Sequence, residues 1–290
     1  MSSAPASTLS PGPWKVAWMR LRQNGAAMLA LCFLVLLVLA CLAGPLLSKY
    51  DQTSQDLALK ATAPSLNHWL GTDALGRDVA TRVLYGGRVS LGVGLLATLV
   101  AMVIGVAYGL ISGLASSRVD SVMMRIVDVL YSFPFMTFVI ILTVVFGREF
   151  WLVFAAIGAV EWLTMARVVR GQVLALKKQE FITAAKSYGA RFHQILGKHL
   201  LPNVLGTVIV YASLTVPGVM MLEAMLSFLG LGLQPPFASW GTMIGEGAAA
   251  MSDHPWLLLG PAAFFSGTLL ALNTLGDGLR DALDPKGSTH

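Results

Sequence analysis

The sequence predicts an all-α integral membrane protein with six transmembrane helices, and three observations lead to this fold class. Hydrophobic residues make up 56% of the 290 residues and charged residues 12%, and the mean hydropathy is +0.70, which is too apolar for a soluble domain. Several runs reach the roughly 20 apolar residues that are needed to cross a hydrocarbon core. One long basic stretch, 177–203, interrupts these runs, as expected of a loop outside the bilayer.

The first span is expected at about 26–47, after a tail, 1–22, that begins with Ser, Pro and Ala and predicts disorder. A basic start before an apolar run also fits a signal peptide, but this run is longer and further spans follow, which favours a retained helix. Cys32 and Cys41 lie inside the run, away from any metal-ligand pattern, and are interpreted as reduced packing residues.

The next segment, 48–88, is polar and ends in an amphipathic helix that leads into the second span. Five more spans are then expected, and Pro134 predicts a kink in the third of the six. We therefore divide the chain into a tail (1–22), a first helix with its outer segment (23–88), a core (89–275) and a second tail (276–290). The remaining spans are predicted at about 89–114, 126–146, 150–166, 205–229 and 256–275.

Charge distribution predicts the orientation of the chain in the membrane. Six spans place both termini on one side, and most of the 20 Lys and Arg residues fall in the tails, in the turn 116–125 and in the loop 167–204. Because loops rich in Lys and Arg face the cytoplasm, both termini and the long loop are expected there. The net charge of +5 is explained in the same way, and no nucleic-acid partner is expected.

The basic stretch 177–203 has the pattern of two short helices joined at a glycine. Gly189 stands where a left-handed cap would end the first helix, and Pro202 is expected to end the second. The helices are predicted either to dock on a partner or to lie on the lipid surface with their basic side toward the headgroups. The apolar stripe of the first helix consists of Phe181, Ala184, Ala185 and Tyr188.

The order Ala184-Ala185, Gly189, Leu201-Pro202 resembles the EAA loop of ABC-importer permeases. Thr183 and His199 depart from that pattern, since the family usually has glutamate and isoleucine there. Threonine lacks the carboxylate that could form a salt bridge to the ATPase. The resemblance implies that the loop 167–204 is the element that seats in a cleft of an ATPase subunit. The coupling residues that it implies are Phe181, Thr183, Ala184, Ala185, Tyr188, Gly189, Leu201 and Pro202.

Further motifs resemble the peptide and nickel importer group, and together they cover about residues 14–286. They include Gly71-Thr72-Asp73 and the residues that follow it, 227–232, and the closing stretch 276–285. Residues 160–172 are most similar to the C-type subunit of oligopeptide and dipeptide permeases. The resemblance implies a type I ABC-importer permease fold in the bacterial inner membrane. It also implies a sister permease, two ATPase subunits and an extracytoplasmic solute-binding protein that delivers short peptides.

No enzymatic activity is expected of this chain. The only Gly-Lys pair near a phosphate-loop context, Gly197-Lys198, lacks the upstream glycine and the following Ser or Thr. ATP and Mg²⁺ are therefore expected on separate ATPase subunits, and no cofactor is expected here. The five histidines show no metal-ligand spacing, so no metal site is predicted.

Charged residues within the spans are candidates for function, because an uncompensated charge is costly in hydrocarbon. Glu223, with Met220 and Met221, is the candidate for the transport pathway; the alternative is a carboxyl that is protonated or paired across a helix interface. Glu161 is expected to pair with Arg167, and Asp128 with Arg125 or Arg118. A second hypothesis is an ion-coupled secondary transporter or channel with Glu223 as relay. The substrate, whether oligopeptide, dipeptide, nickel chelate or another solute, is not specified by the sequence.

Overall fold

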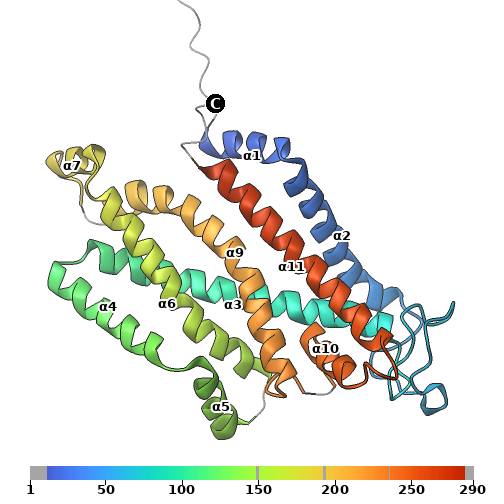
Figure 1. The fold of residues 1–290 in the computed structure, drawn as a ribbon. Coiled ribbons are helices and arrows are strands. Elements are labelled where there is room, and N and C mark those ends of the chain that lie inside the picture. Colours follow the sequence, from blue (N-terminus) through green and yellow to red (C-terminus); the bar gives the residue numbers. More distant parts are fainter. Residues whose placement is uncertain (1–11, 148–149, 192–193, 235, 285–290) are drawn as a thin grey trace, which may run out of the picture.

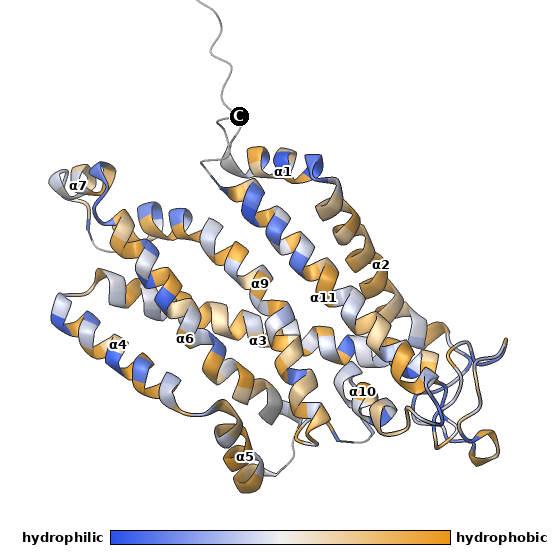
Figure 2. Ribbon diagram, in the orientation of Figure 1, coloured by the Kyte–Doolittle hydropathy of each residue, from blue (hydrophilic) through white to orange (hydrophobic). Residues whose placement is uncertain are grey.

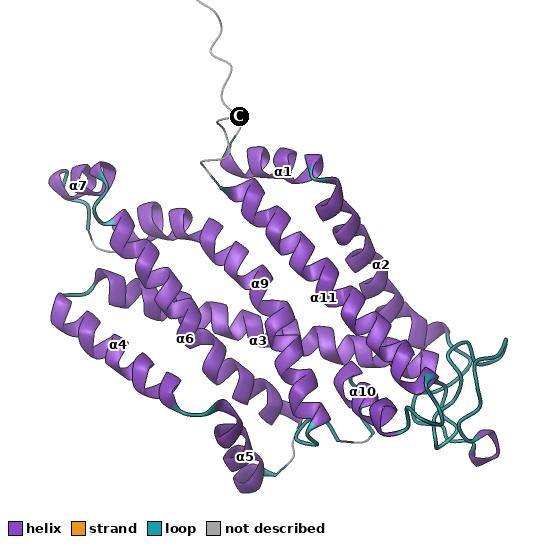
Figure 3. Ribbon diagram, viewed as in Figure 1, coloured by secondary structure: helices purple, strands orange, loops and turns teal. Residues whose placement is uncertain are grey.

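The computed structural model describes residues 12–147, 150–191, 194–234 and 236–284, and this part of the chain is built from helices joined by loops (Figures 1 and 3). The elements in chain order are α1 (Pro13–Gln23), α2 (Gly25–Leu47), the short 3₁₀ helix η1 (Leu57–Leu59), α3 (Val79–Leu114), α4 (Ser117–Ser132), α5 (Phe135–Phe146), α6 (Phe150–Leu176), α7 (Glu180–Ser187), the π-helix η2 (Ile195–Leu200), α9 (Leu201–Phe228), α10 (Trp240–Ala249) and α11 (Trp256–Leu283).

Four stretches of helix are long and apolar enough to cross a membrane within the described residues: α2, α3, η2 with α9, and α11. A fifth is reached if α4 and α5, which meet at an angle of 77°, form one bent span. Figure 2 shows α2 and α5 as almost wholly hydrophobic ribbons. The predicted all-helical membrane protein is thus confirmed, whereas the count of six spans and the side on which the termini lie stay predictions.

The third predicted span, 126–146, is two helices rather than one kinked helix. Phe133, between α4 and α5, has extended backbone angles (φ −72°, ψ 130°). This follows from Pro134, because the proline ring disfavours a helical conformation at the residue before it. α4 also begins nine residues earlier than expected, at Ser117.

Three other boundaries differ from the predicted ones. α3 begins at Val79, so the amphipathic helix and the second span are one helix of 36 residues, and the division at residue 88/89 falls inside it. The Asp78 side chain starts this helix by accepting a hydrogen bond from the Thr81 main-chain N–H (2.8 Å). α6 and α11 extend beyond residues 166 and 275, to Leu176 and Leu283, so the predicted tail 276–290 begins as helix.

The core is organised around α3, which packs against α6, α9, α2 and α10. α3 and α6 approach closely because α3 has glycines where they meet. A Cβ atom at Gly105 would lie 2.6 Å from the Met165 Cβ, and one at Gly109 would lie 2.6 Å from the Ala166 carbonyl oxygen. Small residues of this kind let neighbouring membrane helices pack backbone to backbone.

Helix α1, helix α7 and the end of α11 lie toward one end of the bundle, and residues 48–78 and α10 lie toward the other (Figure 1). Arg20 Nη1 donates to the Asp284 main-chain oxygen (3.0 Å), which joins α1 to the end of α11. We call the first of these the α7 end of the bundle and the other the opposite end. The side of the membrane that each faces is inferred only from the charge distribution.

Candidate functional site

Helix α7 follows α6 after a short turn and projects from the bundle (Figure 1). Its anchor is Ile182, which is fully buried in a cluster with Val169 and Val173 of α6 and with Ile195 and Leu200 of η2. Behind the turn, the Lys177 ammonium donates to the Gly113 main-chain oxygen at the end of α3 (2.8 Å). One buried side chain and these flanking contacts therefore hold the helix to the chain.

The apolar stripe predicted for docking lies on the open side of α7. Tyr188 is 92% exposed and Phe181 42% exposed, Ala184 is exposed, and Ala185 is half-buried. Thr183, beside the stripe, is also exposed, and its hydroxyl donates within the helix to the Gln179 main-chain oxygen (3.5 Å). Four of the side chains assigned to coupling are thus available to a partner: Phe181, Thr183, Ala184 and Tyr188.

The predicted glycine cap of this helix is confirmed. Gly189 has φ +77°, in the left-handed region that residues with a Cβ rarely adopt. The Ala190 N–H then donates back to the Ala185 main-chain oxygen (3.0 Å), which is the six-to-one bond of a Schellman motif. The cap ends α7 sharply and turns the chain back toward α9.

The second predicted short helix is wrong as a separate element. Residues 192 and 193, in its expected first turn, lie outside the described residues, but from Ile195 the chain runs as helix without a break into α9. Pro202 is tolerated because a π-helical turn precedes it, in which the Leu201 N–H donates to the Leu196 oxygen, five residues back. Pro202 therefore does not end a helix, and Leu201 and Pro202 lie instead in the first turn of α9.

Two ion pairs join α4 to α6 near α7. Arg170 binds Asp120 through two parallel bonds, from Nε to Oδ1 and from Nη2 to Oδ2, each 2.6 Å, and Ser112 of α3 also donates to Oδ1. Arg167 binds Asp128 (2.9 Å), and its guanidinium lies 4.6 Å from the ring centre of Tyr131. These pairs replace the predicted ones, in which Glu161 would bind Arg167 and Asp128 would bind Arg125 or Arg118. The sequence contained a signal for these pairs. Arg167 and Arg170 lie three residues apart in α6, and Asp120 and Asp128 lie eight residues apart in α4.

At the opposite end, a buried polar network holds the outer segment to the bundle. Asp73 accepts from Arg77 Nε (2.7 Å) and from Arg82 Nη1 (2.6 Å), and Arg82 also reaches Glu246 of α10 (3.2 Å). Arg82 is almost fully buried, which requires these partners. The sequence analysis found Asp73, Arg77 and Arg82 only as parts of a motif, and it missed the role of Glu246.

A second bond in this segment joins His68 to the start of α3. His68 Nδ1 lies 2.9 Å from Asp78 Oδ1, and both side chains are nearly fully buried. The other carboxylate oxygen of Asp78 accepts from the hydroxyl and the main-chain N–H of Thr81 (2.8 Å each). Among the described residues, no group of three or more His, Cys, Asp and Glu is arranged to hold a metal ion.

The predicted pathway residues lie in different surroundings. Glu223 of α9 is fully buried; its Oε1 accepts from the Ser227 hydroxyl (2.7 Å) and its Oε2 from the Ser90 hydroxyl of α3 (3.4 Å). Met220 is buried as well, whereas Met221 is 60% exposed. The Glu223 carboxyl thus has a hydrogen-bond partner across the interface between α9 and α3. This is the arrangement expected if Glu223 has a structural role and does not contact the substrate.

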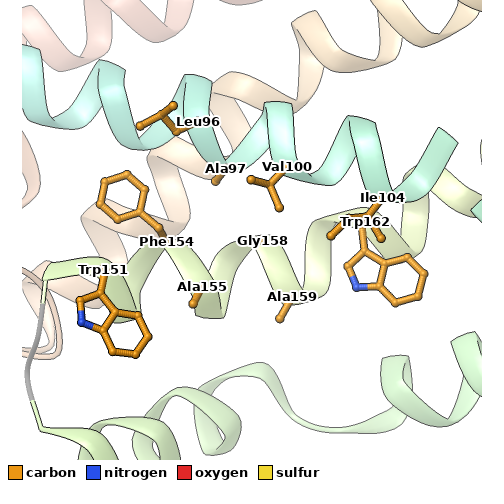
Figure 4. Close-up of a pocket in the computed structure, with 10 residues that line it drawn as sticks. All are labelled: Leu96, Ala97, Val100, Ile104, Trp151, Phe154, Ala155, Gly158, Ala159 and Trp162. Atoms are coloured by element: carbon orange, nitrogen blue, oxygen red, sulfur yellow. The ribbon is translucent and has the colours of Figure 1, made fainter. Parts of the chain in front are cut away.

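An apolar groove of about 710 Å³ lies between α3 and α6 (Figure 4). Two tryptophans, Trp151 and Trp162, lie at its ends, and its walls are nearly all carbon, so it offers little to bind a peptide main chain. Glu223, Met220 and Met221 are not part of its lining. The lining residues are Leu96, Ala97, Val100, Ile104, Trp151, Phe154, Ala155, Gly158, Ala159 and Trp162.

Comparison with known proteins identifies the family. Residues 105–288 match the model of the binding-protein-dependent transport system inner membrane component, and residues 12–64 match the N-terminal TM domain of oligopeptide transport permease C. The oligopeptide transport system permease protein OppC of Escherichia coli (strain K12) is 51% identical over 275 residues, which cover 94% of this chain and 91% of that protein. The dipeptide transport system permease protein DppC of Bacillus subtilis (strain 168) is 48% identical over 271 residues, which cover 93% and 85%.

These relatives are transport permeases, which form a family of non-catalytic subunits, and the similarity extends over nearly the whole chain. The predicted resemblance and the multi-pass location in the inner membrane are thereby confirmed. The chain belongs to the family of binding-protein-dependent transport system inner membrane components.

Proposed function

We propose that this permease forms half of the translocation pathway of an ABC importer for short peptides. A sister permease forms the other half, a solute-binding protein delivers the peptide, and two separate ATPase subunits drive transport. The similarity to permeases named for oligopeptide and dipeptide transport supports the substrate class. The observation that carries the ATP-driven mechanism is the exposed stripe of α7, which Gly189 caps and which the buried Ile182 holds against α6 and η2.

The mechanism follows from how α7 is attached. A partner that binds Phe181, Ala184 and Tyr188 and then moves would displace α7, which is joined to α6 by a short turn. α6 is packed tightly on α3 and bound to α4 by two ion pairs, so its displacement reaches the bent pair α4 and α5. ATP can drive this change only if the closed ATPase dimer favours one of the two arrangements of the permease.

Reconstitution tests the proposal. The permease, its sister, the ATPases and the binding protein are placed in vesicles, and uptake of labelled peptides of two to five residues is followed with and without ATP. We expect uptake that needs both ATP and the ATPases. Uptake by the permease alone, driven by an ion gradient and lost in Glu223→Gln, would instead support the ion-coupled transporter. A nickel chelate in the same assay tests the substrate class.

A further inference from the structure

Helix α1 presents a face that combines aromatic and basic side chains. Trp14 is 52% exposed, Trp18 is 48% exposed, and Lys15, Met19 and Arg22 are exposed beside them. At 3.6 residues per turn these five positions fall within one sector of about 140°. The helix is therefore amphipathic in a particular way, since its open face has two indole rings and two positive charges.

The opposite face of α1 is fixed to the rest of the protein. Leu21 is buried against Leu279 and Ala282 of α11, and Ala17 is buried on the same side. Arg20 lies on this inner side too, nearly opposite the centre of the exposed sector, and donates to the main chain at the end of α11. Because these contacts set the rotation of the helix, its aromatic and basic face is held outward, and no described part of the chain covers it.

The position of α1 along the membrane normal follows from its connection to α2. Asn24 alone separates the two helices; its extended backbone (φ −84°, ψ 97°) breaks them, and its side chain caps α2 by accepting from the Ala27 N–H (3.1 Å). α2 is the most apolar of the candidate spans and exposes Leu29 within its first two turns. The single-residue connection places α1 where α2 enters the hydrocarbon, at the level of the headgroups. Figure 1 shows α1 lying across the end of α11, at an angle to α2.

We infer that the face formed by Trp14, Lys15, Trp18 and Arg22 binds anionic glycerophospholipid headgroups of the bilayer that α2 crosses. Indole rings prefer the interface between water and hydrocarbon, and lysine and arginine in such a helix pair with anionic headgroups. The sequence of α1 contains no acidic residue, so its field is uniformly positive toward the lipid. The face also continues the lipid-exposed surface of α2, which gives it a membrane neighbour without any further partner.

Quenching by brominated lipid tests this site. The full transporter is reconstituted in an equal mixture of phosphatidylcholine and phosphatidylglycerol, with either one or the other brominated near the headgroup end of its acyl chains. Fluorescence from Trp14 and Trp18 is obtained as the difference from a Trp14→Phe/Trp18→Phe protein. Since each cation near an anionic surface contributes about a fivefold preference, we expect several-fold stronger quenching by brominated phosphatidylglycerol.

In the variant Lys15→Glu/Arg22→Glu we expect the two brominated lipids to quench equally. The signal is again a difference, here from the same variant with Trp14→Phe and Trp18→Phe added. Arg118→Glu/Arg280→Glu is the matched control, because it changes the net charge equally at two exposed positions outside α1. Equal quenching in the unaltered protein would overturn the inference, as would an equal loss in the control. Absence of quenching by either lipid would show that α1 faces water or another protein, and would overturn it as well.

Discussion

The ion pair between Asp120 and Arg170 is predicted to hold α4 in place. Within the described residues α4 buries only Val127 and exposes most of its other apolar side chains, so packing alone attaches it weakly. Replacing Arg170 by alanine removes two charge-assisted bonds of 2.6 Å and leaves the Asp120 carboxylate with the Ser112 hydroxyl. The perturbation thus removes the strongest contact between α4 and α6.

The coupling energy between Asp120 and Arg170 follows from the geometry of the pair and from how exposed it is. A hydrogen bond to a charged group contributes about 1.5–3 kcal/mol, and bidentate pairs lie in the upper part of that range. The Arg170 and Asp120 side chains are 31% and 13% exposed, so water screens part of the attraction. We expect a coupling energy of about 2 kcal/mol between the two residues, which is a factor of roughly 30 in the population of α4 docked on α6.

A double-mutant cycle measures this energy. Thermal stability, peptide uptake and ATP hydrolysis are compared for Arg170→Ala, Asp120→Ala and the double variant in the full transporter. We expect the two single variants to hydrolyse ATP but to lose most uptake, and the exchange Asp120→Arg/Arg170→Asp to recover part of it. Strictly additive effects of the single changes, or normal uptake in Arg170→Ala, would refute the reasoning.

Four further predictions follow: two concern α7, one the α2–α3 contact and one Glu223. Tyr188→Ala should leave stability within about 0.5 kcal/mol because the side chain is exposed, yet reduce uptake, whereas Ile182→Ala should cost about 2–5 kcal/mol by removing the buried anchor; unfolding and uptake assays separate the two. Gly189→Pro should reach the membrane but not transport, since proline cannot adopt φ +77°, and an immunoblot with uptake checks this; normal uptake would argue against a role for the cap. Arg88→Leu should destabilise the protein by about 1–3 kcal/mol because Arg88 donates to two main-chain carbonyls of α2, and a thermal unfolding curve unchanged from the unaltered protein would contradict this. Glu223→Gln should keep both stability and uptake, because an amide can still bond the two serine hydroxyls, and an uptake assay that showed selective loss would favour a relay.

The sequence predicted the existence of the apolar helices more reliably than their ends. Hydrophobic runs identify α2 and α9 because no other environment accepts so many apolar residues. The amphipathic helix and the second span were predicted with a division at residue 88/89, whereas α3 is one helix from Val79, with Arg82 and Arg88 in its first turns. Both cations are satisfied by tertiary contacts, with Asp73 and with carbonyls of α2, and sequence periodicity cannot show such contacts. These contacts allow the polar first turns of α3 to continue directly into its apolar part.

The candidate site was predictable where it depends on local rules. The spacing of the α7 stripe and the left-handed cap at Gly189 are properties of neighbouring residues, and the structure has the helix and cap where these patterns predict them. The π-helical turn before Pro202 was not predictable, because nothing in the local sequence distinguishes it from a helix end. The ion pairs between α4 and α6 join residues 50 and 39 positions apart, so they depend on the rotation of each helix.

Helix α6 combines two kinds of contact, and together they explain why force applied at α7 should reach the bent pair α4 and α5. One face, with Val169 and Val173, packs directly on glycines of α3, so α3 and α6 should move as one body. The face with Arg167 and Arg170, one turn apart, contacts α4 through charge-assisted bonds, which have specific geometry but leave α4 with little buried area. Two helices that share only a small apolar contact can shift along each other at low cost. A bidentate ion pair between them, in contrast, fixes their relative position. We therefore expect α4 to follow α6 while its pairs are intact and to be the first helix to move independently once they are broken.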